Sequence, residues 1–195
     1  MRYRVAIAAF VLIGPLLACA ADDPAPQSAS PPGTGRFTMT IDVNGPDGAA
    51  SLRASGSFDH ERRRYSLTTD SSGFVPGLDG PMAMVAMPEA VFIDCPYLTR
   101  LLEAPTKWIK VTGESSDLLR TSLLDSLRVF GGVTTDGLVP RTTMRFAGGT
   151  TEGGALASLE YFDIGAPVII EPPAADQVTD ETAAVKRLFG GTTGG

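Results

Sequence analysis

The residues best suited to catalysis or metal binding surround the only histidine of the chain. His60 stands between Asp59 and Glu61. An imidazole beside carboxylates could act as a general base or bind a metal ion. The three residues are consecutive, however, and they separate two segments that alternate apolar and polar residues. We therefore expect a solvated surface turn here, because neighbouring side chains of such a turn do not converge on one substrate or ion.

Other motifs that could support catalysis are weaker still. The sequence contains no Gly-x-Ser-x-Gly elbow and no cluster of cysteine and histidine with metal-ligand spacing. The glycine-rich string FAGGTTEGGA lacks the lysine of a phosphate-binding loop and is typical of a hairpin turn. Residue order alone leaves a Ser-His-Asp arrangement open. We expect no enzymatic activity, no metal and no cofactor.

The first residues have the composition of an export signal. Arg2 and Arg4 precede 13 mostly apolar residues from Val5 to Leu17. This is a charged region followed by a short apolar region, and the run is shorter than the roughly 20 residues that a membrane-spanning helix needs. We expect residues 1–18 to be a signal peptide that is removed.

The cysteine that follows gives the export signal a further meaning. Leu16-Leu17-Ala18-Cys19 resembles the lipobox of bacterial lipoproteins, which directs lipidation of its cysteine. The resemblance implies an exported protein that is anchored to the outer face of the cell membrane by lipid on Cys19. Two or three acyl chains hold a protein firmly, since each buried CH₂ contributes about 0.8 kcal/mol. The alternative is an ordinary signal peptide with an accidental cysteine.

Composition divides the remaining chain into a tether, one domain and a tail. Residues 19–35 are rich in proline, serine and alanine and cannot bury enough surface to fold, so we expect a mobile tether. Residues 36–189 have the length of a single domain, and residues 190–195 form a flexible tail. Cys95 would be alone if Cys19 is lipidated; we expect a small buried hydrophobe, the alternative being a reactive or dimer-forming thiol.

The charge of the exported part excludes nucleic acid as a partner. Residues 1–18 contain two arginines and no acidic residue, so 14 basic and 22 acidic residues remain, a formal charge of −8. Such a domain is repelled by phosphates and by anionic headgroups. Attachment to the membrane must therefore come from the anchor.

Alternation of apolar and polar residues predicts a mostly antiparallel β domain with few helices. One amphipathic helix is expected from a cap at Ser115 or Ser116 to Phe130, and a short one over residues 181–189. The expected strands cover residues 37–43, 52–58, 64–68, 82–87, 90–93, 108–111, 142–146, 155–162 and 168–170.

Three blocks of sequence carry a family resemblance. They are RFTMTIDVNGPDGAASLRASGSFDHERRRYSL, EAVFIDCPYLTRLLEAPTKWIKVT and SLEYFDIGAPVIIEPPAADQV. Their order resembles the LppX/LprG-like lipoproteins of actinobacteria, relatives of the LolA-type carriers. The resemblance implies an α+β fold: a strongly curved, mostly antiparallel sheet, or half barrel, with one or two helices packed on its concave face. It also implies an apolar cavity for acyl chains. This chain lacks the usual first helix and is shorter after Phe130, so we expect a shortened member with a smaller cavity or an open groove.

The function suggested by these features is the binding or transport of acyl chains of envelope lipids or other acylated molecules. The alternative is an anchored interaction or scaffold module that recruits an envelope protein and has no ligand cavity. The side chains below would line a cavity in the first case and fill a dry core in the second. The candidates are Phe37, Met39, Ile41, Leu52, Phe58, Met82, Met84, Leu119, Leu123 and Leu127.

Overall fold

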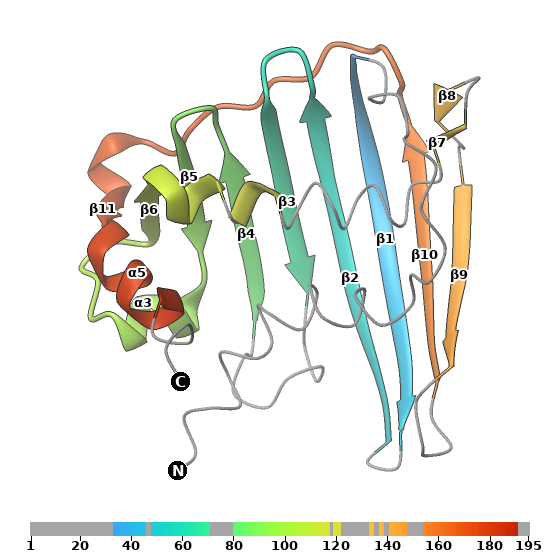
Figure 1. Cartoon of the computed structure of the whole chain (residues 1–195), viewed down its shortest axis with the longest axis horizontal. Helices are drawn as coiled ribbons and strands as arrows, with labels where there is room; N and C mark the ends of the chain where they lie inside the picture. The colour runs from blue at the N-terminus through green and yellow to red at the C-terminus, as the bar shows by residue number, and fades with distance from the viewer. Residues whose placement is uncertain are drawn as a thin grey trace.

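The protein is an α+β domain built on one open, mostly antiparallel sheet with few helices (Figure 1). The computed structural model describes residues 33–45, 48–70, 80–117, 119–121, 133–134, 137–138, 141–147 and 154–190. The predicted signal peptide, Cys19 and almost all of the tether lie outside the described residues.

Nine of the described strands form the sheet in the order β11-β6-β5-β4-β3-β2-β1-β10-β9. Every neighbouring pair is antiparallel except β11 and β6, which are parallel. The mostly antiparallel α+β class predicted from alternation is thereby confirmed. The strands of the first half are β1 (Thr34–Gly45), β2 (Gly48–Asp59), β3 (Arg64–Asp70), β4 (Pro81–Ala86), β5 (Ala90–Asp94) and β6 (Trp108–Thr112). Those of the second half are β9 (Arg141–Ala147), β10 (Gly154–Phe162) and β11 (Val178–Asp180).

The order of the strands shows how the chain returns to its start. The six strands from β1 to β6 follow one another as a meander, and β10 then pairs with the free side of β1. Phe37 of β1 stands opposite Tyr161 of β10 in this pairing. A separate pair of short strands, β7 (Val133–Thr134) and β8 (Gly137–Leu138), lies in a region for which no strand was predicted.

The described helices lie toward the β4–β6 side of the sheet (Figure 1). They are α3 (Pro96–Leu101), which was not predicted, and α5 (Thr182–Gly190), which was. Residues 113–117 and 119–121 are also helical. Leu98, Leu119 and Val185 of these segments belong to the apolar cluster formed by one face of the sheet, so the helices pack on that face.

The predicted start of the middle helix is wrong. Helical backbone begins at Gly113, and Ser116 lies inside the segment with its hydroxyl donating to the Gly113 carbonyl, 2.7 Å away. Ser116 is buried, and its hydroxyl bonds a carbonyl one turn earlier instead of capping the free amide groups at the start of the helix. The predicted end at Phe130 lies outside the described residues.

A buried arginine holds this helical segment to the sheet. Arg120 is 5% exposed, and its Nη1 donates to the carbonyls of Met87 and Pro88 at 2.9 and 2.8 Å. Its other terminal nitrogen pairs with Asp117 one turn earlier. The guanidinium therefore donates hydrogen bonds to the carbonyls of the turn that joins β4 to β5, and this attachment holds Leu119 over the sheet.

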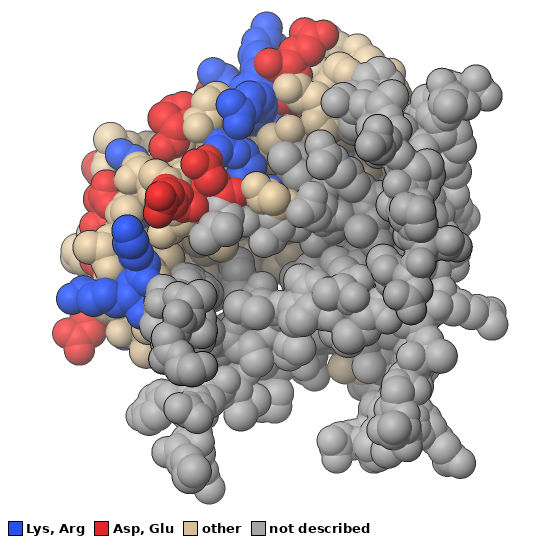
Figure 2. Space-filling model, viewed as in Figure 1, with Lys and Arg blue, Asp and Glu red and all other residues tan. Residues whose placement is uncertain are grey.

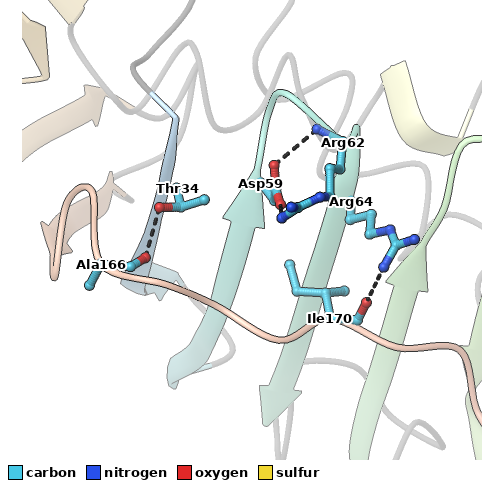
Figure 3. Close-up of polar contacts among 6 residues, drawn as sticks. All are labelled: Thr34, Asp59, Arg62, Arg64, Ala166 and Ile170. Atoms are coloured by element: carbon cyan, nitrogen blue, oxygen red, sulfur yellow. Dashed lines mark hydrogen bonds and ion pairs between the residues drawn. The ribbon is translucent and has the colours of Figure 1, made fainter.

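The last predicted strand, residues 168–170, is also wrong. Residues 163–174 contain no described strand and instead cross the end of the sheet where β2 and β3 are joined (Figures 1 and 3). We call this segment the strap. It is bonded to the ends of two strands: the Gly165 N–H donates to the Thr34 carbonyl, Thr34 Oγ1 donates to the Ala166 carbonyl, and Arg64 Nη1 donates to the Ile170 carbonyl.

Candidate functional site

The largest apolar surface built by the described residues is one face of the sheet, which we call the inward face. Every second residue of each strand points to this face, because side chains alternate between the two faces of a pleated strand. Polar residues such as Thr38 and Ser55 point the other way and are exposed. In β1–β3 the sheet has one wet face and one apolar face. On β4–β6 the opposite face is also apolar, with Met87, Ala90 and Phe92 buried in a second cluster.

The strand register arranges the inward face in rows. One row runs from β10 to β6 and is apolar throughout: Tyr161, Phe37, Gly56, Leu67, Met84, Ile93 and Ile109. The row beside it runs from β10 to β4: Leu159, Met39, Ala54, Thr69 and Met82. Segments more than a hundred residues apart therefore contribute to one continuous surface.

Eight of the ten predicted lining residues lie together on this surface. Phe37, Met39, Leu52, Phe58 and Met84 are buried in one cluster, and Ile41, Met82 and Leu119 are partly buried against it. Leu123 and Leu127 lie outside the described residues. Sequence alternation thus places these side chains on the same face, while their contact with a ligand stays a prediction.

Two glycines allow phenylalanine rings to lie flat on the strands. A Cβ atom on Gly35 would come within 2.6 Å of Phe58 Cζ, and one on Gly56 within 2.6 Å of Phe37 Cζ. Each glycine stands directly opposite the phenylalanine whose ring covers it. Each strand of the β1–β2 pair thus contributes one glycine that is covered by a phenylalanine ring of the other strand. It closes one end of the inward face with rings in fixed positions.

An aromatic group with polar edges extends from this end. The Phe58 and Tyr161 rings meet edge to face with centroids 5.9 Å apart, and the His60 ring lies 4.9 Å from that of Phe58. His60 Nδ1 is 3.0 Å from the Tyr65 hydroxyl. Burial raises the pKa of Tyr161 to about 12, so its phenol stays neutral at physiological pH.

The strap is fixed by polar contacts at the same end of the sheet (Figure 3). Asp59 is 3% exposed and accepts from the Arg62 backbone N–H and guanidinium at 2.9 and 3.0 Å. Beside it, Arg64 Nη1 donates to the Ile170 carbonyl at 3.3 Å. An open hollow of about 200 Å³ lies between the strap and these side chains. Its lining combines acidic and basic side chains with Ile169.

The environment of His60 corrects the expectation of a fully solvated turn. Residues 60–63 do form a turn, but Asp59 is the last residue of β2 and is buried. Burial tends to raise the pKa of Asp59, and the hydrogen bonds from Arg62 with the charges of Arg62 and Arg64 outweigh it, so the pKa is lowered overall. Asp59 is therefore an ion-pair partner of Arg62. Among the described residues, no group of three histidine, cysteine or acidic side chains could hold a metal ion.

Cys95 is buried where β5 leads into α3, which agrees with its predicted role as a small hydrophobe. Burial raises the pKa of its thiol. A buried thiol of this kind stays protonated and is a weak nucleophile.

Sequence reasoning missed two features of the inward face, Thr69 and the buried Arg120. Thr69 continues the alternation of Tyr65 and Leu67, so the period of β3 contained the signal. Arg120 follows Leu119 in the helical stripe, and its target carbonyls belong to a turn that sequence could not place beside it.

The described surface shows no field of one charge in the view of Figure 2, where acidic and basic side chains are interspersed. None of the helices in the described ranges is long and apolar enough to cross a membrane. Comparison of the chain with protein-family models and with curated proteins finds no match.

Proposed function

We propose that this chain is an exported, lipid-anchored protein of the cell envelope that binds acyl chains against the inward face of its sheet. The observation that carries the proposal is the continuous apolar floor from β10 to β6. A floor of this width can lie under several extended hydrocarbon segments, because neighbouring strands are about 4.8 Å apart.

The composition of the floor suits flexible apolar ligands. Met82 and Met84 lie on β4, Met39 lies on β1 with β2 and β3 between them, and all three belong to or pack against the same cluster. Methionine has an unbranched, polarizable side chain that adapts to ligands of different shape. In this proposal the sheet bends around the ligand as a half barrel of the LolA type, and the helices at the β4–β6 side close one flank.

The location of the protein supports the same function. The export signal, Cys19 and the tether would place the domain at a bilayer surface, where acyl chains are the abundant apolar molecules. Its acidic charge would keep the domain itself off anionic headgroups.

A bulky substitution in the floor distinguishes a ligand space from a dry core. Ala54 is buried at the centre of its row, between Met39 and Thr69. In a dry core, Ala54→Phe would lower the free energy of unfolding by about 1–3 kcal/mol through overpacking. In a ligand space, the ring would occupy the volume of an acyl chain, and stability would change little. Ser55→Phe, which points to the solvated face from the next position, is the matched control.

The test uses the mature chain carrying Cys19→Ser, secreted from bacteria and extracted for lipid analysis by mass spectrometry. We expect bound lipid in this protein and in the Ser55→Phe variant, and a loss of most of it in the Ala54→Phe variant at similar stability. Protein that is free of lipid and binds no fluorescent fatty acid would refute acyl binding. The anchored interaction module would then be the remaining function.

A further inference from the structure

Two aliphatic hydroxyls stand at strand positions of the inward face whose side chains the structure describes, and only one of them is buried. Thr179 of β11, opposite Ile109, is half-buried at the edge of the sheet, and its hydroxyl bonds that of Thr106 at 2.6 Å. Thr69 is 5% exposed and lies in β3 between Ala54 and Met82, which stand directly opposite it on the two neighbouring strands. The hydroxyl is therefore surrounded by hydrocarbon.

This hydroxyl is unsatisfied. Thr69 Oγ1 has no hydrogen-bond partner in the part of the chain that the structure describes. A buried polar atom without a partner costs free energy, and nearly all such atoms in folded proteins are paired. Valine has almost the same shape and carries no such cost, so it would be the better residue for a position that only fills a core.

The neighbours of Thr69 are small or flexible. Ala54 offers only a methyl group, and Met82 is flexible and partly buried. The hydroxyl is buried, so a ligand atom reaches it by displacing these side chains. On the β1–β2 pair, by contrast, the Phe37 and Phe58 rings cover the two glycines.

We propose that the Thr69 hydroxyl donates a hydrogen bond to the carbonyl oxygen of a bound acyl group, a step that rests on the proposed acyl-binding function. The carbonyl of an ester or a fatty acid is the polar atom nearest to the hydrocarbon tail. Thr69 would thus fix how far the tail enters along β3, with the hydrocarbon lying toward Leu67 and Met84.

The experiment compares two probes with sixteen-carbon chains, using wild type, Thr69→Val and Thr69→Ser. Methyl palmitate has an ester carbonyl and hexadecane has none. Both compete with a fluorescent fatty acid for the mature chain carrying Cys19→Ser. We expect Thr69→Val to bind methyl palmitate about three- to tenfold more weakly, the range for loss of one neutral hydrogen bond, and hexadecane equally well. Thr69→Ser should restore most of the affinity for the ester. Palmitic acid as a third probe shows whether a free carboxyl group serves as well as the ester.

Unfolding of the lipid-free protein provides a second measurement. Thr69→Val should be as stable as wild type or more stable, because it removes an unpaired hydroxyl from an apolar setting. If Thr69→Val is less stable, the hydroxyl is bonded within the protein and the proposal is wrong. Equal affinity of wild type and Thr69→Val for methyl palmitate also overturns it and leaves acyl binding intact. Failure of wild type to bind any of the probes refutes the proposed function itself.

Discussion

Substitution of Gly56 by alanine tests the packing that closes one end of the inward face. A Cβ atom at this position would lie 2.1 Å from the Ser66 carbonyl oxygen and 2.6 Å from Phe37 Cζ. The first distance is 1.3 Å short of the 3.4 Å at which ordinary contact begins. Since the carbonyl belongs to the backbone of β3, the β2–β3 pair must separate or twist to admit the methyl group.

The expected loss of stability is large for so small a change. Gly→Ala at an unstrained position would stabilise the fold by about 0.4–1 kcal/mol through the unfolded chain. Here the overlap costs as much as severe overpacking, so we expect a net loss of about 3 kcal/mol in the free energy of unfolding. For a domain of this size, that loss lowers Tm by roughly 6–12 °C.

Urea unfolding followed by the fluorescence of Trp108, the only tryptophan, measures this loss. Gly35→Ala is the informative comparison, because the three atoms nearest to its Cβ would belong to the side chains of Phe58 and Ile164, the closest of each at 2.6 and 2.9 Å. We expect it to cost less than Gly56→Ala. Ser55→Ala, on the exposed face, should stay within about 0.5 kcal/mol of wild type. A Gly56→Ala protein as stable as wild type would show that the two strands do not approach as described.

Three further predictions concern the buried charges and the anchor. Asp59→Asn should lower the free energy of unfolding at neutral pH. Because the pKa of Asp59 is lowered from 3.8 in the folded protein, the stabilisation by its carboxylate is complete above about pH 4. In urea titrations the difference in stability between wild type and variant should shrink as the pH falls below that value. A difference that stays constant down to about pH 2 would contradict this assignment. Arg120→Met should lower the free energy of unfolding by about 2–4 kcal/mol, because it leaves the Met87 and Pro88 carbonyls without their donor. Asp117→Asn changes the exposed partner of Arg120 and should cost less than about 1 kcal/mol. Equal losses in the two variants would exclude the carbonyl contacts as the cause. Cys19→Ser should release the secreted mature chain from membranes in a fractionation assay, and mature protein that still sediments with membranes would rule out the lipid anchor.

The candidate site could be predicted in part because apolar and polar residues alternate along a strand that is buried on one face. Phe37, Met39 and Ile41 alternate with polar residues, and the structure places all three on one face. Thr69 continues the same alternation in β3, but a threonine at an apolar position gives no sign of whether its hydroxyl has a hydrogen-bond partner. That depends on the atoms opposite it on β2 and β4.

Two incorrect predictions share a cause. Residues 168–170 have the β-branched composition of a strand, yet Arg64 binds the Ile170 carbonyl and the segment crosses the sheet instead of joining it. Ser116 has the composition of a helix cap, yet helical backbone already begins at Gly113. In both places local propensity was overridden: at Ile170 by a long-range contact with Arg64, and at Ser116 by a helix that starts three residues earlier.

The amino-acid sequence by itself determined which residues alternate between water and the interior, and hence the class of the fold and the apolar character of one face. It also contains the export signal and Cys19, which are read as linear motifs. Only the tertiary structure decided that β10 pairs with β1, that each phenylalanine ring covers the glycine opposite it, and that Arg120 satisfies a distant turn. The physical reason is that alternation records whether a residue is buried, whereas the choice of partner depends on chain closure over more than a hundred residues and on the exact approach of two backbones.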